Sequence, residues 1–359
     1  MALFKKLFSK SDSNKAPRGF HSIAIKAVTK VAPDTVKIEL EIPSNLTSAF
    51  SYVPGQYINF AITINGKEHR RSYSICSGKG EPLAVAVKKV QNGTVSVWFN
   101  EVAAAETSVF VSVPEGGFVR PSSANKVVAI AAGSGITPIM SIAKDIETKG
   151  AKMQLLYGSK TEESVIFKSD LDALQNTSTT YYLSQESKDG FEKGRIDKAS
   201  FTALIKSNLD ILKSDAFLMC GPEQLIKHAA DTLKEFGVSD DKVHFELFTD
   251  PVLMKSEIKP ENASFDGTSN VTIIIDGDET TFEMSPNQNV LDSAIKNGVD
   301  APYSCKGGVC STCKAKVIEG KVSMKLNYSL TDSETEEGFI LTCQSHASSE
   351  SLIVNYDEA

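Results

Sequence analysis

Four cysteines near the C-terminus have the spacing of metal-cluster ligands, and they are Cys305, Cys310, Cys313 and Cys343. The first three form a Cys-x4-Cys-x2-Cys run, and the fourth lies further along the chain. This is a thiolate spacing that binds a 2Fe–2S cluster. Gly307 and Gly308 give the loop backbone freedom and leave its N–H groups open toward the sulfurs. The sequence therefore predicts a carrier of single electrons.

Two other arrangements of these cysteines remain open. A structural zinc site usually has two Cys-x2-Cys pairs, whereas only Cys310 and Cys313 have that spacing here. Two disulfides would suit a secreted protein, but the apolar run at the N-terminus is too short for a secretory signal. The 2Fe–2S interpretation accounts for the spacing of all four residues.

A second group of residues, Arg71-Ser-Tyr-Ser74, suits the binding of a flat ring that carries a diphosphate. An arginine can hold a diphosphate through two parallel hydrogen bonds. Tyr73, on the same strand face, can lie against a ring, and the Ser74 hydroxyl can reach a ring nitrogen. A surface arginine beside a core tyrosine is the alternative, because a run this short also occurs by chance.

Two glycine-containing turns suit a dinucleotide. Ala132-Gly-Ser-Gly-Ile-Thr-Pro138 joins an apolar run to a helical pattern, so Gly133 and Gly135 permit a tight turn at a helix N-terminus, where a diphosphate binds. This is not the G-x-G-x-x-G fingerprint. Cys220-Gly-Pro222 follows another apolar run. For Cys220 the alternative is a buried core thiol.

The elements that must position these residues change character along the chain. Short alternating segments at 22–26, 36–42, 57–62 and 83–87 predict an antiparallel barrel, with Arg71–Ser74 just after one of its strands. From Lys126 onward, apolar runs at 127–131, 153–157, 180–183 and 216–220 alternate with helical patterns, of which 222–236 is the clearest. These predict a parallel α/β sheet, with 243–248 as its last strand.

The C-terminal region reads as a separate module after a linker. A hairpin is expected at 271–275 with its turn at Asp276-Gly277, then a short helix around 290–297 and a final strand at 352–354. The predicted organisation is multidomain: a basic tail over 1–19, a barrel over 20–122, an α/β domain over 123–249, a linker over 250–267 and the cysteine module over 268–359.

The first motif, taken with its neighbours, resembles the flavin site of the ferredoxin–NADP reductase superfamily. Pro54-Gly-Gln-Tyr57 and Gly93-Thr-Val-Ser96 match its other flavin segments. By this resemblance Arg71 binds the pyrophosphate of FAD, Tyr73 packs on the isoalloxazine and Ser74 addresses N5. The implied flavin-binding residues are Tyr57, Arg71, Ser72, Tyr73, Ser74, Gly93, Thr94, Val95 and Ser96.

The glycine turns resemble the nicotinamide motifs of the same superfamily. The resemblance implies that Cys220 lies beside the nicotinamide, which makes Tyr73, Ser74 and Cys220 the catalytic candidates. The implied nucleotide-binding residues are Gly133, Ser134, Gly135, Thr137, Pro138, Cys220, Gly221 and Pro222. In related reductases the segment at 244–248 approaches the flavin edge, so Glu246 and Phe248 are further candidates; simple strand alternation is the alternative.

The residues expected near a nucleotide 2′-phosphate favour NADPH. NADPH-using members of the superfamily place a serine and usually an arginine where this chain has Ser159 and Lys160. Lysine keeps the charge but not the forked geometry, and Arg195 is a second candidate. Glu162 and Glu163 are the alternative, because a carboxylate that accepts the ribose hydroxyls is typical of NAD enzymes.

The order of domains and several local runs, among them Pro302–Cys310 and Gly194–Asp197, resemble the reductase subunits of phenylacetyl-CoA epoxidases from about Phe20 to Tyr356. The resemblance implies a β-grasp ferredoxin domain after the flavin and nicotinamide domains. It also implies electron transfer from NADPH through FAD and a 2Fe–2S cluster to the oxygenase subunits of a multicomponent monooxygenase. The alternatives are a reductase for another oxygenase or a desaturase, a general NADPH diaphorase, and a non-enzymatic metal-binding module.

Composition limits the partners. The formal net charge is −7, and acidic residues gather after Asp266. Nucleic acid is therefore not an expected partner, whereas docking on a basic protein surface is compatible. No stretch is long enough for a membrane span; the basic tail is compatible with a frayed end or with peripheral membrane contact. Six cysteines without a signal sequence predict the reducing cytoplasm.

Overall fold

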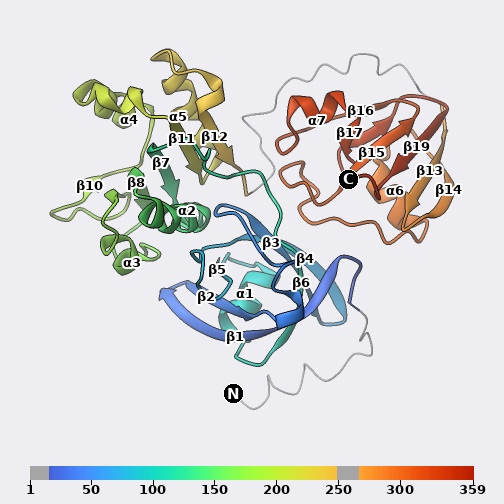
Figure 1. The fold of residues 1–359 in the computed structure, drawn as a ribbon, viewed down its shortest axis with the longest axis horizontal. Coiled ribbons are helices and arrows are strands. Elements are labelled where there is room, and N and C mark those ends of the chain that lie inside the picture. The colour runs from blue at the N-terminus through green and yellow to red at the C-terminus, as the bar shows by residue number, and fades with distance from the viewer. Residues whose placement is uncertain (1–15, 249–266) are drawn as a thin grey trace. The chain divides into compact units, whose positions relative to one another are not determined.

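The computed structural model describes residues 16–248 and 267–359 (Figure 1). The chain divides into two compact units: one contains Phe20–Phe248, and the other contains the C-terminal residues together with Pro17–Gly19. Most of the predicted tail (1–19) and nearly all of the predicted linker (250–267) lie outside the described residues.

The first half of the N-terminal unit is an antiparallel barrel, as predicted. Its sheet has the order β4-β3-β6-β1-β2-β5, and a bridge between Ile75 and Val85 joins the end of β4 to β5. One longer helix, α1, and a short 3-10 turn at Ser44–Leu46 complete it. The elements are β1 Phe20–Ala32, β2 Thr35–Glu41, β3 Tyr57–Ile64, β4 Lys67–Ser74, β5 Ala84–Lys88, α1 Thr94–Glu101 and β6 Ser108–Ser112.

Arg71–Ser74 lie within a strand, as expected for the strand face of Tyr73, and the placement of the run just after a strand was wrong. These residues are the last four of β4, which pairs with β3 from Ile64↔Lys67 to Tyr57↔Ser74. Asn65 and Gly66 both have positive φ, at 53° and 75°, so they form the tight hairpin turn that joins β3 to β4. The polar start of β4, Lys-Glu-His-Arg-Arg, concealed the strand because it lacks apolar alternation.

The second half of the N-terminal unit is the predicted parallel sheet, with the order β10-β9-β8-β7-β11-β12. From β7 the chain builds outward through β8, β9 and β10, then returns to place β11 on the other side of β7. The carboxyl ends of β7 and β11 thus flank a topological switch point, where open α/β sheets bind ligands. The strands are β7 Lys126–Ala132, β8 Lys152–Ser159, β9 Thr177–Leu183, β10 Glu192–Lys193, β11 Ala216–Cys220 and β12 Val243–Glu246.

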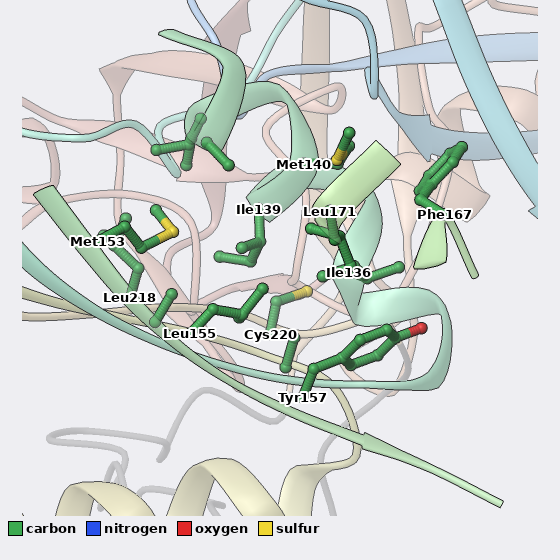
Figure 2. Close-up of a cluster of buried hydrophobic side chains, with 14 of the residues drawn as sticks. Ile136, Ile139, Met140, Met153, Leu155, Tyr157, Phe167, Leu171, Leu218 and Cys220 are labelled. Carbon is green, nitrogen blue, oxygen red and sulfur yellow. The ribbon is translucent and has the colours of Figure 1, made fainter. Parts of the chain in front are cut away.

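Helices cover the sheet, and α2 lies at the centre of its core (Figure 2). Ile136, Ile139 and Met140 of α2 pack in one buried cluster with side chains of β8 and β11. The same cluster includes Cys76 and Phe118 from the barrel side. A few barrel-side residues therefore join the core of the parallel sheet, while the barrel has a separate apolar core that includes Ile23, Phe60 and Phe99. The helices are α2 Ile136–Lys149, α3 Lys168–Asp172, α4 Lys198–Ser207 and α5 Glu223–Glu235.

The C-terminal unit has a mixed five-stranded sheet with the order β14-β13-β19-β15-β17 and a small β16-β18 pair. Among the described strands of this unit, only β13 and β19 pair in parallel, and α6 contributes Val290, Leu291 and Ala294 to the core. This confirms the predicted ferredoxin-like module, including the turn at Asp276-Gly277. The elements are β13 Ser269–Ile275, β14 Asp278–Met284, α6 Val290–Lys296, β15 Lys314–Glu319, β16 Val322–Met324, α7 Asp332–Glu336, β17 Phe339–Leu341, β18 Ser345–Ala347 and β19 Ser351–Asn355.

Within the described ranges, the structure contains no helix that is both long enough and apolar enough to cross a membrane.

Candidate functional site

Three aromatic rings hold the strand that carries Arg71–Ser74. Tyr73 makes edge-on contacts with Phe60 of β3 and Phe99 of α1, with ring centroids 5.8 and 5.6 Å apart. Phe60 and Phe99 also contact each other at 5.1 Å. Such contacts stabilise a defined ring orientation. They fasten β4 to α1, and neither phenylalanine had a sequence signal that marked it as part of the site.

The start of α1 lies in the same half of the barrel. Gly93 is its N-cap in extended backbone, followed by Thr94, Val95 and Ser96. A Cβ on Gly93 would lie 2.5 Å from Ser96 Oγ, so a larger residue would displace the hydroxyl. Ser96 Oγ accepts a hydrogen bond from the Val90 N–H at 3.1 Å, which fixes the turn. The first N–H groups of the helix can therefore receive phosphate oxygens.

The remaining flavin candidates differ in exposure. Arg71 is exposed, and its guanidinium donates to the carbonyl of the preceding residue, Arg70, at 2.6 Å. Tyr57 is buried, and its ring packs against Gly116, where a Cβ would come within 2.8 Å of the ring. Ser72 donates to Asn59 Oδ1 at 2.7 Å. The guanidinium at the surface suits a charged diphosphate.

Three predicted residues from different elements converge at one point. Ser74 ends β4, Cys220 ends β11 and Glu246 ends β12, with Cys220 and Glu246 paired in register. The Ser74 hydroxyl donates to Glu246 Oε2 at 3.1 Å. A serine from the barrel thus meets two residues at the carboxyl ends of the parallel strands. The residues lie far apart in the sequence, and the fold alone brings them together.

Burial controls the charge of this group. Desolvation raises the pKa of Glu246 to about 8, although the residue as a whole is partly exposed and the Ser74 hydroxyl acts in the opposite direction. Burial, and then the Glu246 carboxylate, raises the pKa of Cys220 well above its ordinary value. Cys220 is therefore a neutral thiol, and the Glu246 carboxyl holds a proton more readily than a surface glutamate does.

The first glycine turn lies beside Cys220. Gly133 has a φ of +56°, and Gly133–Gly135 form a short 3-10 turn that leads into α2. A Cβ on Gly135 would lie 2.1 Å from the Cys220 carbonyl oxygen, so only glycine fits this approach. Thr137 Oγ1 donates to the Ser134 carbonyl at 3.0 Å and steadies the turn. Pro138 follows in the first turn of α2, and Gly221 and Pro222 lead from β11 into α5.

The carboxyl ends of the parallel strands carry the three residues expected near a 2′-phosphate, which are Ser159, Lys160 and Arg195. Ser159 is in register with Leu183 of β9, and Leu183 with Lys193 of β10. Because the three strands are parallel, the residues after them emerge at the same edge. Lys160 and Arg195 are exposed, and Ser159 Oγ lies 2.8 Å from Ser164 Oγ. Two cations and a hydroxyl near this edge suit a phosphate.

The alternative carboxylate, Glu162, already has partners. The Glu162 carboxylate forms an ion pair with Lys188. The backbone N–H of Glu162 donates to the Glu186 carboxylate at 2.8 Å. The sequence analysis did not single out Lys188, which has no motif around it. The ion pair lowers the negative field that Glu162 would direct at a nearby phosphate. Phe248, the last described residue of this unit, is 41% exposed and free to contact a ring.

The four cysteine thiols form two pairs. Cys305 and Cys310 have their sulfurs 3.1 Å apart, and Cys313 and Cys343 hydrogen-bond to each other. None of the six cysteines is in a disulfide. Among the described residues, no group of His, Cys, Asp and Glu side chains surrounds a single ion position. Two thiol pairs are the donor set that two adjacent iron atoms require.

A backbone N–H and a side-chain amide are directed at these sulfurs. The Gly307 N–H donates to Cys305 Sγ at 3.3 Å, and the Gln344 amide reaches Cys343 Sγ at 3.6 Å. The hydrogen bond from the Cys310 thiol, helped by N–H groups of the loop, lowers the pKa of Cys305 to about 6. Donors of this kind stabilise thiolates and cluster sulfurs. The loop therefore fits a 2Fe–2S cluster on its own geometry.

Comparison with known families agrees with the three domains described above. Residues 22–119 match the family "Oxidoreductase FAD-binding domain", residues 129–231 match "Oxidoreductase NAD-binding domain", and residues 273–348 match "2Fe-2S iron-sulfur cluster binding domain". FAD, a nicotinamide nucleotide and a 2Fe–2S cluster are thus the cofactors of the chain. The non-enzymatic alternative is set aside, and the chain is an NAD(P)H-dependent oxidoreductase.

Individual relatives are similar over nearly the whole length. A component of the 1,2-phenylacetyl-CoA epoxidase of Escherichia coli (strain K12) is 35% identical over 94% of this chain and 98% of its own. The ferredoxin reductase component of 3-ketosteroid-9-alpha-monooxygenase from Mycobacterium tuberculosis is 32% identical over 86% of each chain. By name the first relative is a subunit of an epoxidase, and the second is the ferredoxin reductase component of a monooxygenase.

Solved structures share the fold. Phthalate dioxygenase reductase has a TM-score of 0.58 at 24% identity, covering 94% of this chain and 98% of its own. An intact type IV self-sufficient cytochrome P450 monooxygenase has a TM-score of 0.72 at 21% identity and covers 98% of this chain, which spans 44% of that longer protein.

The fold and the three sites define a flavin- and iron–sulfur-dependent reductase of the type that supplies electrons to oxygenases. Within that class, the chain belongs to the family of oxygenase reductase components that includes the matching component of the E. coli phenylacetyl-CoA epoxidase.

Proposed function

We propose that this reductase takes electrons from NADPH and passes them singly to the oxygenase subunits of a phenylacetyl-CoA 1,2-epoxidase. The observation that supports the first half is the meeting of Ser74, Cys220 and Glu246 where the barrel faces the ends of β11 and β12. Bound FAD would supply the conversion of a two-electron hydride donor into single electrons for a one-electron cluster. The protein would hold the nicotinamide ring and the flavin ring in the relative orientation that hydride transfer requires.

The barrel residues would bind FAD. We propose that Arg71 pairs with the pyrophosphate, that Thr94, Val95 and Ser96 offer it N–H groups after Gly93, and that Tyr57 and Tyr73 contact the ring system with Ser72 nearby. Ser74 would address N5, with Glu246 as the partner that orients its hydroxyl. The aromatic contacts of Tyr73 with Phe60 and Phe99 support this role, since they limit its rotation.

The parallel sheet would bind the nucleotide. We propose that the turns at Gly133–Pro138 and Cys220–Pro222 hold the diphosphate and the nicotinamide, with Phe248 against the ring. Ser159, Lys160 and Arg195 would receive the 2′-phosphate. The ion pair between Glu162 and Lys188 supports NADPH over NADH, because it withdraws the carboxylate that would otherwise repel that phosphate.

The C-terminal cysteines would bind the cluster. We propose Cys305 and Cys310 as ligands of one iron, and Cys313 and Cys343 as ligands of the other, because these are the pairs whose thiols contact each other. The corresponding domain limits would be 20–122, 123–249 and 268–359. The thiol ligands and the absence of disulfides among all six cysteines support a reducing compartment such as the cytoplasm.

The choice of oxygenase rests on overall similarity, and 3-ketosteroid and glycine betaine monooxygenases are the alternatives that other relatives suggest. The test is reconstitution: the purified reductase is mixed with NADPH and, in turn, with the oxygenase components of each system. Epoxidation of phenylacetyl-CoA that depends on this reductase is the expected result. Turnover with only another oxygenase would contradict the proposed acceptor while leaving the reductase assignment intact.

A further inference from the structure

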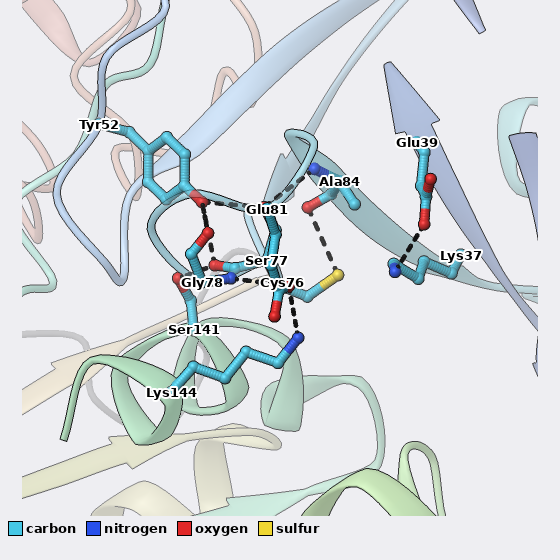
Figure 3. Close-up of polar contacts among 10 residues, drawn as sticks. All are labelled: Lys37, Glu39, Tyr52, Cys76, Ser77, Gly78, Glu81, Ala84, Ser141 and Lys144. Carbon is cyan, nitrogen blue, oxygen red and sulfur yellow. Dashed lines mark hydrogen bonds and ion pairs between the residues drawn. The ribbon is translucent and has the colours of Figure 1, made fainter. Parts of the chain in front are cut away.

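One face of α2 is attached to the barrel by polar contacts (Figure 3). The Ser141 hydroxyl donates to the Ser77 carbonyl at 2.7 Å, and both residues are fully buried. One turn later, the Lys144 ammonium donates to Glu81 Oε2 at 2.6 Å. Positions three apart lie on the same side of a helix. These two contacts therefore form a single line of attachment between α2 and the barrel segment at 76–84.

The next residue on this face makes a third contact. Asp145 pairs with Arg120, which lies between the barrel and β7, at 3.1 Å with both side chains below 10% exposure. Arg120 also donates to the Ala124 carbonyl at 2.5 Å. Within the described residues, Arg120 Nε lacks a hydrogen-bond acceptor. A buried pair with an unsatisfied group adds little net stability, so a role in fixing orientation is the better account.

The barrel segment at 76–84, which contacts α2, is held in place by further hydrogen bonds. The Tyr52 hydroxyl lies 3.0 Å from Ser77 Oγ and 2.9 Å from the Gly78 carbonyl. Ser77 Oγ accepts the Ala84 N–H at 3.0 Å, and Glu81 Oε2 accepts the Gly78 N–H at 3.0 Å. Figure 3 shows these bonds forming a continuous network that ends on α2. The segment therefore cannot shift without breaking several bonds at once.

Both ends of this network adjoin the proposed site. Ser77 is three residues after Ser74, and α2 begins directly after Gly135. Gly135 in turn approaches the carbonyl of Cys220. On one side, a short chain segment connects the network to Ser74, the proposed flavin contact. On the other side, α2 connects it directly to the proposed nucleotide turn. The apolar core between the two halves holds them together, but apolar contacts are non-directional and do not by themselves set an angle.

We infer that Ser141 and Lys144 are positioning residues: with Ser77, Glu81 and Tyr52 they form a joint that sets the nucleotide turn at the distance from Ser74 that hydride transfer needs. This inference rests on the proposed function. Loss of the joint lets α2 and its glycine turn shift by a fraction of an ångström against the barrel. Reaction at a near-attack geometry is sensitive to such shifts. Binding of the nucleotide, which depends on the α/β half alone, is retained.

The test compares two pairs of variants in the flavin-loaded full-length protein. Ser141→Ala and Lys144→Met each remove one contact of the joint. Their controls are Thr232→Val, which removes a fully buried hydroxyl bonded within α5 at 2.7 Å, and Lys168→Met, which removes an ion pair of 2.6 Å within α3. Lys144→Arg, which keeps the charge, is the conservative variant. All six proteins, the unmodified one included, are measured together.

Two readouts separate positioning from general stability. The first is anaerobic flavin reduction by NADPH in rapid mixing, beside the Kd for NADP+. We expect the limiting rate constant to fall about ten-fold in each joint variant, with the Kd changed less than about two-fold, and to be unchanged in the controls and in Lys144→Arg. Photochemical reduction of the flavin, which needs no nucleotide, stays equal in all variants. The second readout is hydrogen exchange of the segment 76–84, which should quicken only in Ser141→Ala and Lys144→Met.

The outcomes are distinct. Faster exchange at 76–84 with an unchanged rate of reduction would overturn the inference, as would a slowing that the control variants share. Exchange that is unchanged in both joint variants would also overturn it, because the contacts then hold nothing in place. Failure of NADPH to reduce the unmodified protein would contradict the proposed function instead, and hydrogen exchange would still decide whether the joint exists.

Discussion

The cluster loop and the flavin–nucleotide site differ in how far apart in the sequence their residues lie. Three of the four thiols come from the nine residues Cys305–Cys313, and the loop's own N–H groups face them. The other site is assembled from the ends of β4, β11 and β12, so that Ser74 and Glu246 are 172 residues apart. A local site can be read from spacing, whereas an assembled site depends on packing between domains.

The largest expected effect separates the two sites. Cys310→Ser removes a thiolate that the cluster needs, so the visible absorbance and iron content of the cluster should be lost. Reduction of the flavin by NADPH should remain, because its residues belong to the other compact unit. Iron analysis and anaerobic flavin reduction measure the two effects. Loss of both the cluster and flavin reduction would show that the local site and the assembled site depend on each other.

Nucleotide choice is expected to show the next largest effect. A charge-assisted hydrogen bond to the 2′-phosphate contributes ~1.5–3 kcal/mol, which corresponds to a preference for NADPH in kcat/KM of roughly ten- to a hundred-fold. Lys160→Ala should remove most of this preference and leave turnover with NADH nearly unchanged. Steady-state kinetics with both nucleotides measure it, with Lys168→Ala as a surface-lysine control. Equal efficiency of NADH and NADPH in the unmodified protein would instead favour Glu162 or Glu163 as ribose partners.

Flavin affinity should respond to the strand that sequence analysis misplaced. Arg71→Ala and Tyr73→Ala should each weaken FAD binding by ~1–3 kcal/mol, through lost charge-assisted or aromatic contacts. Fluorescence titration of the flavin-free protein with FAD gives the change in Kd. Arg18→Ala, in the other unit, is the control. Full FAD occupancy in both variants would place the flavin elsewhere on the barrel.

The last expected effect is on the pH dependence of stability. The folded-state pKa of Glu246 is about 8, above its ordinary value of 4.5. The folded protein therefore binds the proton more tightly, and this contribution to stability is complete below about pH 4.5 and is lost as the pH rises through 8. Glu246→Gln should flatten the fall in Tm across this window. Thermal unfolding at pH 5 to 9 measures it, and parallel curves for the two proteins would disprove the shift.

The sequence predicted the local features of the molecule better than the features that are assembled by packing. The cysteine spacing, the hairpin at Asp276-Gly277 and the buried parallel strands were predictable, because each is a local pattern. The strand β4 was not, since its polar start hides the alternation. The joint between Ser77 and Ser141 had no signal at all: the two serines lie 64 positions apart and belong to no motif. Their significance appears only when the barrel and α2 are packed together.

The central claim is that one chain carries electrons from a nicotinamide nucleotide through FAD to a 2Fe–2S cluster. The most direct measurement is anaerobic rapid mixing of the unmodified protein with NADPH, with flavin absorbance followed in time and samples frozen for electron paramagnetic resonance. We predict that the flavin bleaches first and that the signal of a reduced 2Fe–2S cluster then develops, while Cys310→Ser bleaches without that signal. A flavin that is reduced with no cluster signal in the unmodified protein would contradict the account.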